Sequence, residues 1–260
     1  MEWKKKMRRI IPGFYAACVV MVFFFFLYLC ANITNHAVHN QMDTSFFKFE
    51  NYDLVHMEDE SAPLGVRDVY TMEISDVSEG GSSLAFYSIH QNVEAYLEGE
   101  CIYTLRPEET NGFGKTPGSN WNTILINFAD AGKEVRVILT PVYESSRNIV
   151  PDFYVGSKYG IWGHILKEDF LAFVLSFVAI VIGLVFIFFT MSIYHTAEVD
   201  KSLIMLGMFS LNIGLWKITD MASMSLIFPF SIPLANLPFL CLMLVVVPFI
   251  LYVKELFSTR

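Results

Sequence analysis

Two long stretches without charge limit how this chain can fold. Ile10–Ala31 and Phe170–Tyr194 contain no Asp, Glu, Lys or Arg, and each is long enough to meet the roughly 20 residues that an apolar helix needs to cross a bilayer. With 54% hydrophobic residues and a mean hydropathy of +0.45, the chain is too apolar for one soluble domain. We therefore expect a membrane protein.

Basic residues precede the first apolar stretch and predict its orientation. Five Lys and Arg residues lie between Lys4 and Arg9, which places the N-terminus in the cytoplasm by the positive-inside rule. A cleaved signal peptide is the alternative, but its apolar core is usually shorter than this run. We interpret residues 1–33 as a cytoplasmic basic tail and a first transmembrane helix.

The last part of the chain predicts further spans. After Phe170–Tyr194, apolar segments at about Leu203–Ile218 and Leu234–Val253 are candidates for a third and a fourth span. The segment Met221–Pro233 is apolar but short and broken by prolines, so we expect an interfacial or re-entrant piece there. Residues 168–260 are thus expected to hold three further transmembrane helices of an incomplete bundle, in a multi-pass protein of the cell membrane.

The polar residues 34–167 between these stretches predict an extracytoplasmic β-domain. Short alternating runs are separated by turn residues, which is typical of antiparallel strands. Gly99 lies between two such runs and can adopt the positive φ of a tight hairpin. We expect an all-β sandwich of the jelly-roll kind, inserted between transmembrane α-helices. The predicted strands are Val69–Ile74, Leu84–Ile89, Val93–Leu97, Cys101–Leu105, Trp121–Phe128, Glu134–Leu139 and Phe153–Val155.

Charge and motifs exclude several classes of function. The net charge of -8 argues against nucleic acid as a partner. Cys101 is the only cysteine of the polar region and so has no partner for a disulfide within it. The six histidines lack metal-ligand spacing, and hydrolase and nucleotide-binding signatures are absent. We predict no metal, no cofactor and no catalytic activity in this chain, and a local ion pair between Lys217 and Asp220.

Amide, basic and aromatic residues near strand ends are the candidates for ligand binding. A glycine-rich loop, Asn111–Trp121, follows the predicted hairpin, and such loops often shape a ligand surface. An aromatic ring beside amide and basic groups is suited to a sugar or another small polar molecule. Alternatively, Trp121 fills one end of the sandwich and Gln91 caps a strand. The candidate residues are His90, Gln91, Asn92, Tyr96, Arg106, Lys115, Trp121 and Asn122.

Three segments carry a family resemblance. His90–Tyr103, Gly114–Trp121 and Tyr154–Lys158 resemble the extracellular jelly-roll domain of Firmicute membrane receptors, which are similar to the seven-transmembrane receptors with diverse intracellular signalling modules. The run Gly207–Trp216 and the proline-broken segment after it look like the start of their membrane bundle. The resemblance implies a longer parent with a GGDEF-type diguanylate cyclase or a histidine kinase as output, although neither motif is present here.

Together these observations predict the sensory input and membrane portion of a bacterial signal-transduction receptor. Its expected partners are the lipid bilayer and an unknown small-molecule or carbohydrate-like ligand, with a homodimer as an open option. A membrane-anchored carbohydrate-binding or adhesion module without signalling output is one alternative. A transport subunit is another, although it would need more polar residues in its spans.

Overall fold

The computed structural model describes residues 44–78, 81–107, 115–193, 202–227 and 231–258. They form two compact units. The β unit holds the described residues of Asp43–Asp169 and Met221–Asn236, and the helical unit holds those of Phe170–Asp220 and Leu237–Arg260. The predicted first span, Ile10–Ala31, lies outside the described residues.

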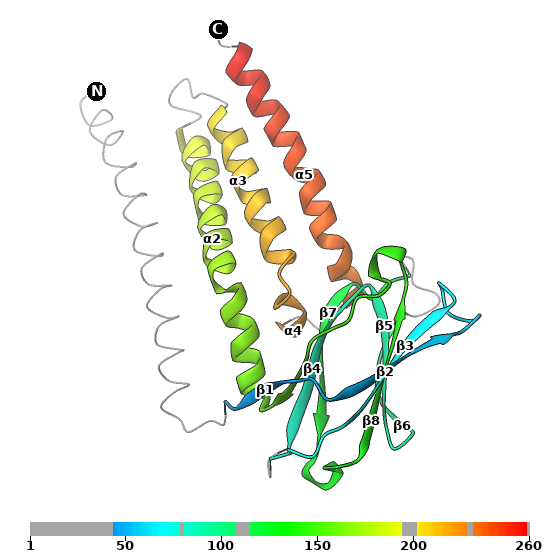
Figure 1. The fold of residues 1–260 in the computed structure, drawn as a ribbon. Helices are drawn as coiled ribbons and strands as arrows, with labels where there is room; N and C mark the ends of the chain where they lie inside the picture. Colours follow the sequence, from blue (N-terminus) through cyan, green and yellow to red (C-terminus); the bar gives the residue numbers. More distant parts are fainter. Residues whose placement is uncertain (1–43, 79–80, 108–114, 194–201, 228–230, 259–260) are drawn as a thin grey trace, which may run out of the picture. The chain divides into compact units, whose positions relative to one another are not determined.

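Two antiparallel sheets build the β unit (Figure 1). Sheet A has the order β1-β9-β4-β7, and sheet B has the order β2-β3-β8-β5-β6. All seven predicted strands are confirmed. The strands of sheet A are β1 (Phe46–Phe49), β9 (Phe153–Gly156), β4 (Ser82–Ile89) and β7 (Ser119–Ile126), and those of sheet B are β2 (Tyr52–Glu58), β3 (Val66–Glu73), β8 (Glu134–Pro141), β5 (Gln91–Leu97) and β6 (Glu100–Leu105).

The core lies between the inner faces of the two sheets. Side chains alternate along each strand, so Leu84 and Phe86 of β4 face the same cluster as Tyr70 of β3 and Phe153 of β9. These four side chains are fully buried, and the ring of Phe153 lies 5.1 Å from that of Phe86 and 5.2 Å from that of Tyr70. Aromatic packing across the two sheets therefore closes the sandwich.

The hairpin between β5 and β6 forms as predicted. Leu97 pairs with Glu100, which leaves a two-residue loop of Glu98 and Gly99 with φ of +49° and +88°. Positive φ at both central residues is the requirement of the type I′ turn that suits strand twist. Cys101 next to this turn is a free, exposed thiol, as the cysteine count predicted.

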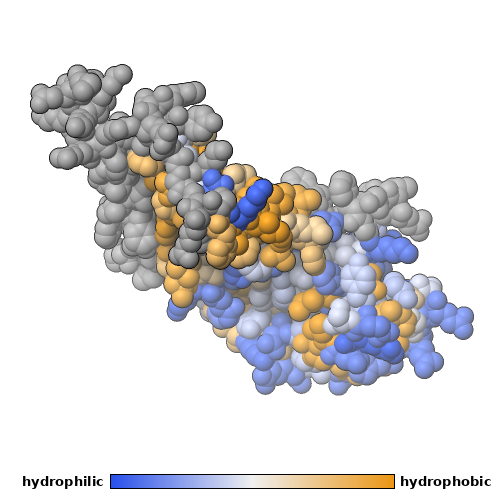
Figure 2. Space-filling model, turned by 90° about the horizontal axis from the view of Figure 1, so that it is seen from above, coloured by the Kyte–Doolittle hydropathy of each residue, from blue (hydrophilic) through white to orange (hydrophobic). Residues whose placement is uncertain are grey.

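Helices make up the rest of the described chain. They are α2 (Lys158–Ile193), α3 (Ser202–Thr219), the short α4 (Met224–Ile227) and α5 (Ser231–Ser258). Within the described residues, Lys158–Ser192, Ser202–Thr219 and Asn236–Glu255 are long and apolar enough to cross a membrane. Figure 2 shows the corresponding apolar surface in orange over the helices. Helix α2 begins at Lys158, well before the predicted span, because its first turns pack on sheet A.

Small residues bring α2 and α3 into close contact in the helical unit. A Cβ on Gly183 would lie 2.6 Å from the backbone nitrogen of Leu211, and one on Gly214 would lie 2.7 Å from the Ser176 carbonyl oxygen. The Ser210 hydroxyl donates to the Ala179 carbonyl oxygen at 2.8 Å. Close backbone approach through small residues, reinforced by such hydrogen bonds, is the usual way in which helices associate in lipid.

Two polar contacts lie in the helical unit. The Asn212 amide donates to the Leu244 carbonyl oxygen of α5 at 3.4 Å. Lys217 Nζ lies 3.4 Å from Asp220 Oδ2, which confirms the predicted local ion pair. Each of these contacts gives a polar group of α3 a partner within the helical unit.

Two glycines of α2 give a matched test of the α2–α3 contact. We expect Gly183→Ala to lower the thermal unfolding midpoint of the full chain in detergent, because the new methyl group collides with the α3 backbone. Gly163→Ala should be neutral or raise stability by up to about 1 kcal/mol, since a Cβ at Gly163 meets nothing within 4 Å and alanine favours helix. Equal effects of the two substitutions would contradict this packing.

Candidate functional site

The outer face of sheet A is covered by residues that precede the apolar part of α2. Ala85 of β4 is fully buried there against Ile161 and Ile165, which are one turn apart on α2. The Ser157 hydroxyl accepts the Gly160 N–H at 3.0 Å, which is the N-cap interaction that starts a helix. Sheet A is thus apolar on both faces, with α2 as its outer layer.

The chain enters and leaves the sandwich at adjacent points. The Ser157 N–H donates to the Ser45 carbonyl oxygen at 2.8 Å, and β1 pairs with β9. A Cβ on Gly160 would collide with the backbone of Thr44. Only glycine lets the first turn of α2 approach the incoming strand this closely.

The segment that follows α3 also packs on sheet A. The Ser225 hydroxyl of α4 accepts the backbone N–H of Trp121 at 3.0 Å, and the Ser223 N–H donates to Asp169 Oδ2 at 2.8 Å. We expected an interfacial or re-entrant piece at Met221–Pro233. In the structure Met221–Asn236 belongs to the β unit, because its polar groups and Leu226 find partners on β7 and α2.

Trp121 borders two cavities beside this covered face, and the first of them also reaches Tyr103 and Leu105 of β6 in sheet B. The first has a volume of about 370 Å³ and the second about 440 Å³. Trp121 lines both cavities, and its ring lies 5.5 Å from that of Tyr87 and 6.0 Å from that of Tyr154. Volumes of 300 to 1,000 Å³ are typical of sites for small molecules.

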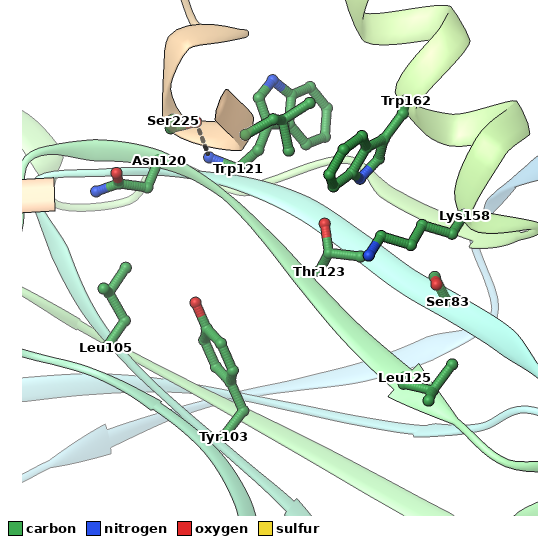
Figure 3. A pocket seen from close by; sticks show the side chains of 11 residues that line it. Ser83, Tyr103, Leu105, Asn120, Trp121, Thr123, Leu125, Lys158, Trp162 and Ser225 are labelled. Atoms are coloured by element: carbon green, nitrogen blue, oxygen red, sulfur yellow. Dashed lines mark hydrogen bonds between the residues drawn. The ribbon is translucent and has the colours of Figure 1, made fainter. Parts of the chain in front are cut away.

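The first cavity combines apolar walls with hydrogen-bond donors. Figure 3 shows the Thr123 hydroxyl, the Trp162 indole nitrogen and the Lys158 ammonium group pointing toward one another. The ammonium nitrogen lies over the Trp162 ring, 4.7 Å from its centre. Further residues that line this cavity are Ser83, Tyr103, Leu105, Leu125 and Leu226.

The second cavity is acidic. Asp152, Glu168 and Asp169 line it together with Tyr87 and Tyr154. Part of this charge is compensated, since Asp152 pairs with Lys48 at 2.8 Å and Glu168 lies 3.5 Å from His164. Burial, followed by the neighbouring Asp152 charge, raises the pKa of Tyr154 above its usual value. Its phenol is therefore a neutral hydrogen-bonding group in this cavity.

The predicted ligand residues do not converge on one site. Trp121 lies on the outer face of sheet A rather than inside one end of the sandwich. Asn122, its neighbour on β7, faces inward, where its Oδ1 accepts from the Tyr103 hydroxyl at 3.1 Å and its amide donates to Ser88 Oγ at 2.9 Å. These contacts link the two sheets, so Asn122 is a structural residue.

His90 and Gln91 lie where β4 turns into β5. His90 has φ of +51°, and its Nδ1 is 3.1 Å from the Thr116 hydroxyl. Burial lowers the pKa of His90. The Gln91 amide is fully buried and donates to the Ser146 carbonyl oxygen at 3.3 Å, which ties β5 to the β8–β9 connection. Both residues thus stabilise a corner of the sandwich.

The remaining candidates are spread over the outer face of sheet B and a loop. The Tyr96 hydroxyl donates to Glu94 at 2.9 Å, and this hydrogen bond raises the pKa of Tyr96. Arg106 lies 3.7 Å from the same carboxylate. Asn92 lies on the same face of β5 as Glu94 and Tyr96, and Lys115 is exposed. None of these residues lines either cavity.

Sequence reasoning missed Lys158, Trp162 and Ser225. The first two were placed at the end of the β-domain without a role, although the i, i+4 pair Ile161 and Ile165 indicates a helix with one apolar face. No local signal predicts that Ser225 contacts Trp121, because 104 residues separate them. Among the described residues, no group of three His, Cys, Asp or Glu side chains could hold a metal ion.

Comparisons with known proteins add little to this geometry. The chain matches no protein-family model and no curated protein. Among solved structures, it is similar to an exo-β-1,3-galactanase from Phanerochaete chrysosporium determined with galactose, with 14% identity and a TM-score of 0.21. The match covers 43% of this chain and 28% of that enzyme, so the chain spans little more than a quarter of the enzyme's length. A similarity this low carries no inference about ligand or reaction.

The contact between α4 and β7 can be tested at Ser225. Ser225→Ala removes the acceptor of the Trp121 N–H, so hydrogen exchange at that amide in the full chain should accelerate by about tenfold or more. Ser225→Thr keeps the hydroxyl and serves as the control. Unchanged exchange in the alanine variant would show that the segment does not dock on β7.

The lowered pKa of His90 predicts that the stability of the fold depends on pH. Because burial lowers its folded-state pKa, the unfolded chain takes up the proton first, and stability should fall as pH drops from about 6.5 toward the folded-state pKa. Asn tolerates the positive φ at this position, so His90→Asn should keep the fold. It should also remove the part of the acid-induced loss of stability that comes from protonation of His90. Thermal unfolding midpoints of both proteins between neutral and mildly acidic pH measure the difference; parallel curves would refute the assignment.

Proposed function

We propose that this chain is the sensory input and membrane portion of a bacterial signal-transduction receptor. The β unit is a jelly-roll-like, extracytoplasmic sensor for a small-molecule or carbohydrate-like ligand, and the apolar helices anchor it as a multi-pass protein in the cell membrane. A longer parent with a cyclic-di-GMP-synthesising or histidine kinase output completes the pathway.

One observation carries this proposal. Both cavities border the face of sheet A that is covered by the first turns of α2 and by residues 222–226, and these two segments adjoin the apolar helices. A ligand in either cavity contacts these segments. Because a ligand shifts a conformational equilibrium only through different contacts in the two states, this is the right position from which to act on the helices.

The strand order supports the jelly-roll component of the proposal. Successive strands from β3 to β9 alternate between the sheets in the pattern B, A, B, B, A, B, A. With β1 paired to β9 at one edge of sheet A and β2 added beside β3, this order supports a two-sheet Greek-key arrangement of the jelly-roll kind. Such folds host many functions, so the function rests on the site and not on the fold.

The apolar surface supports the membrane component. Large side chains of α5 remain open on the helical unit, with Met243 76% and Phe239 65% exposed. In water such a surface would favour aggregation, whereas in a bilayer it is the expected lipid-facing side.

Coupling can be tested without knowing the ligand. In a variant whose native cysteines are serines, spin labels at Met191 of α2 and Ile250 of α5, which are both more than half exposed, report the distance between these helices in nanodiscs. We expect Trp121→Ala to shift this distance distribution, because it removes the wall between the cavities.

The matched control is Phe128→Ala, at an aromatic residue that is 57% exposed and lines neither cavity. It should leave the distribution unchanged. If Trp121→Ala also leaves it unchanged in a folded protein, the β unit does not act on the helices, and an anchored binding module without signalling output describes the chain better.

A further inference from the structure

Three buried polar atoms at the first cavity have no hydrogen-bond partner among the described residues. They are the indole nitrogens of Trp121 and Trp162 and the hydroxyl oxygen of Thr123. A buried polar group without a partner costs free energy comparable to a lost hydrogen bond. Figure 3 shows the Trp162 nitrogen beside the Thr123 hydroxyl and the Lys158 ammonium group, whereas the Trp121 nitrogen points away from them. Two such atoms beside one ammonium group indicate that their polar partner comes from outside the protein.

The chemistry of these groups defines what that partner offers. An indole N–H and a lysine ammonium group donate hydrogen bonds and cannot accept them, and a hydroxyl can donate. Lys158 is the charged residue of the cavity lining, and no described lining residue is acidic. The cavity therefore suits hydrogen-bond acceptors that carry negative charge.

The charge of the ligand is also limited. One lysine balances one negative charge, and the second cavity on the other side of Trp121 is lined by Asp152, Glu168 and Asp169. These carboxylates disfavour a dianion nearby. The Trp162 ring and Leu105, Leu125 and Leu226 offer apolar contact for the rest of the molecule.

We propose that the cavity between Trp121, Trp162 and Lys158 binds a small monocarboxylate, with the carboxylate on Lys158, the Trp162 N–H and the Thr123 hydroxyl, and a compact body such as one sugar ring on the apolar wall. The cavity volume of about 370 Å³ fits a molecule of this size. The assignment rests on the proposed sensory function and names its ligand class.

Binding to the full chain in nanodiscs tests this assignment. The probes are glucuronate, galacturonate and lactate, and glucose and galactose serve as neutral counterparts of the two acidic sugars. Isothermal titration calorimetry measures affinity, and tryptophan fluorescence reports whether the probe reaches the indoles. We expect at least one carboxylate to bind about tenfold or more tightly than its neutral counterpart or than glucose.

Substitutions on α2 and β7 locate the site. Lys158→Met should weaken carboxylate binding by about tenfold or more, and Thr123→Val, which keeps the side-chain shape, should weaken it less. Lys167→Met makes the same change of charge on the same helix, at an exposed residue outside the cavity, and should bind like the unmodified protein.

Three results would overturn the assignment: no binding of any of the three carboxylates, equal affinity for acidic and neutral sugars, or equal losses in the two lysine variants. The sensory function is judged separately by the α2–α5 distance. If carboxylates bind at Lys158 but Trp121→Ala does not change that distance, the ligand class is supported and the coupling to the helices is rejected. If Trp121→Ala changes the distance but no carboxylate binds, the coupling is supported and the ligand class is rejected.

Discussion

The packing of α2 on the outer face of sheet A is the contact on which the rest of the β unit depends. Ala85 lies on the face of β4 opposite Leu84 and Phe86, yet all three are fully buried. A sheet that is apolar on both faces needs a layer on each side. Sheet B supplies the inner layer, and Ile161 and Ile165 of α2 supply the outer one.

This arrangement makes the domain boundary different from the boundary of the apolar span. The first turns of α2 and the segment Met221–Asn236 belong structurally to the sandwich, although each continues directly into a helix apolar enough to cross a membrane. Helix α2 therefore runs without a break from the β unit into the helical unit.

The same packing explains why the candidate site lies where it does. Trp121 and Thr123 are on the outward side of β7, an edge strand of sheet A, and would face solvent in a bare sandwich. Lys158, Trp162 and Ser225 close over them. Around this cavity, the Trp162 indole nitrogen and the Thr123 hydroxyl are buried without a partner in the part of the chain that the structure describes.

Local patterns were sufficient for most strands and for the apolar helices. Alternation of apolar and polar residues predicted β3 to β9, and hydropathy predicted the apolar parts of α2 and α3. The strands β1 and β2 were missed because their own sequences do not alternate clearly. Phe46–Phe49 is only four residues long, and Tyr52–Glu58 carries Asp53, His56 and Glu58. Position at an edge is not the reason, since β6 and β7 are also edge strands and were predicted.

The sequence by itself determined which segments are strands, which are apolar helices, and where the tight Glu98–Gly99 turn falls, because each of these depends on neighbours within a few residues. Only the tertiary structure decided which face of β7 lines the two cavities. It separated Trp121 from Asn122, moved His90 and Gln91 into a structural corner, and brought Lys158, Trp162 and Ser225 to one cavity. The physical reason is that these contacts depend on how sheet A is covered by residues far away in the chain, and no local pattern records that packing.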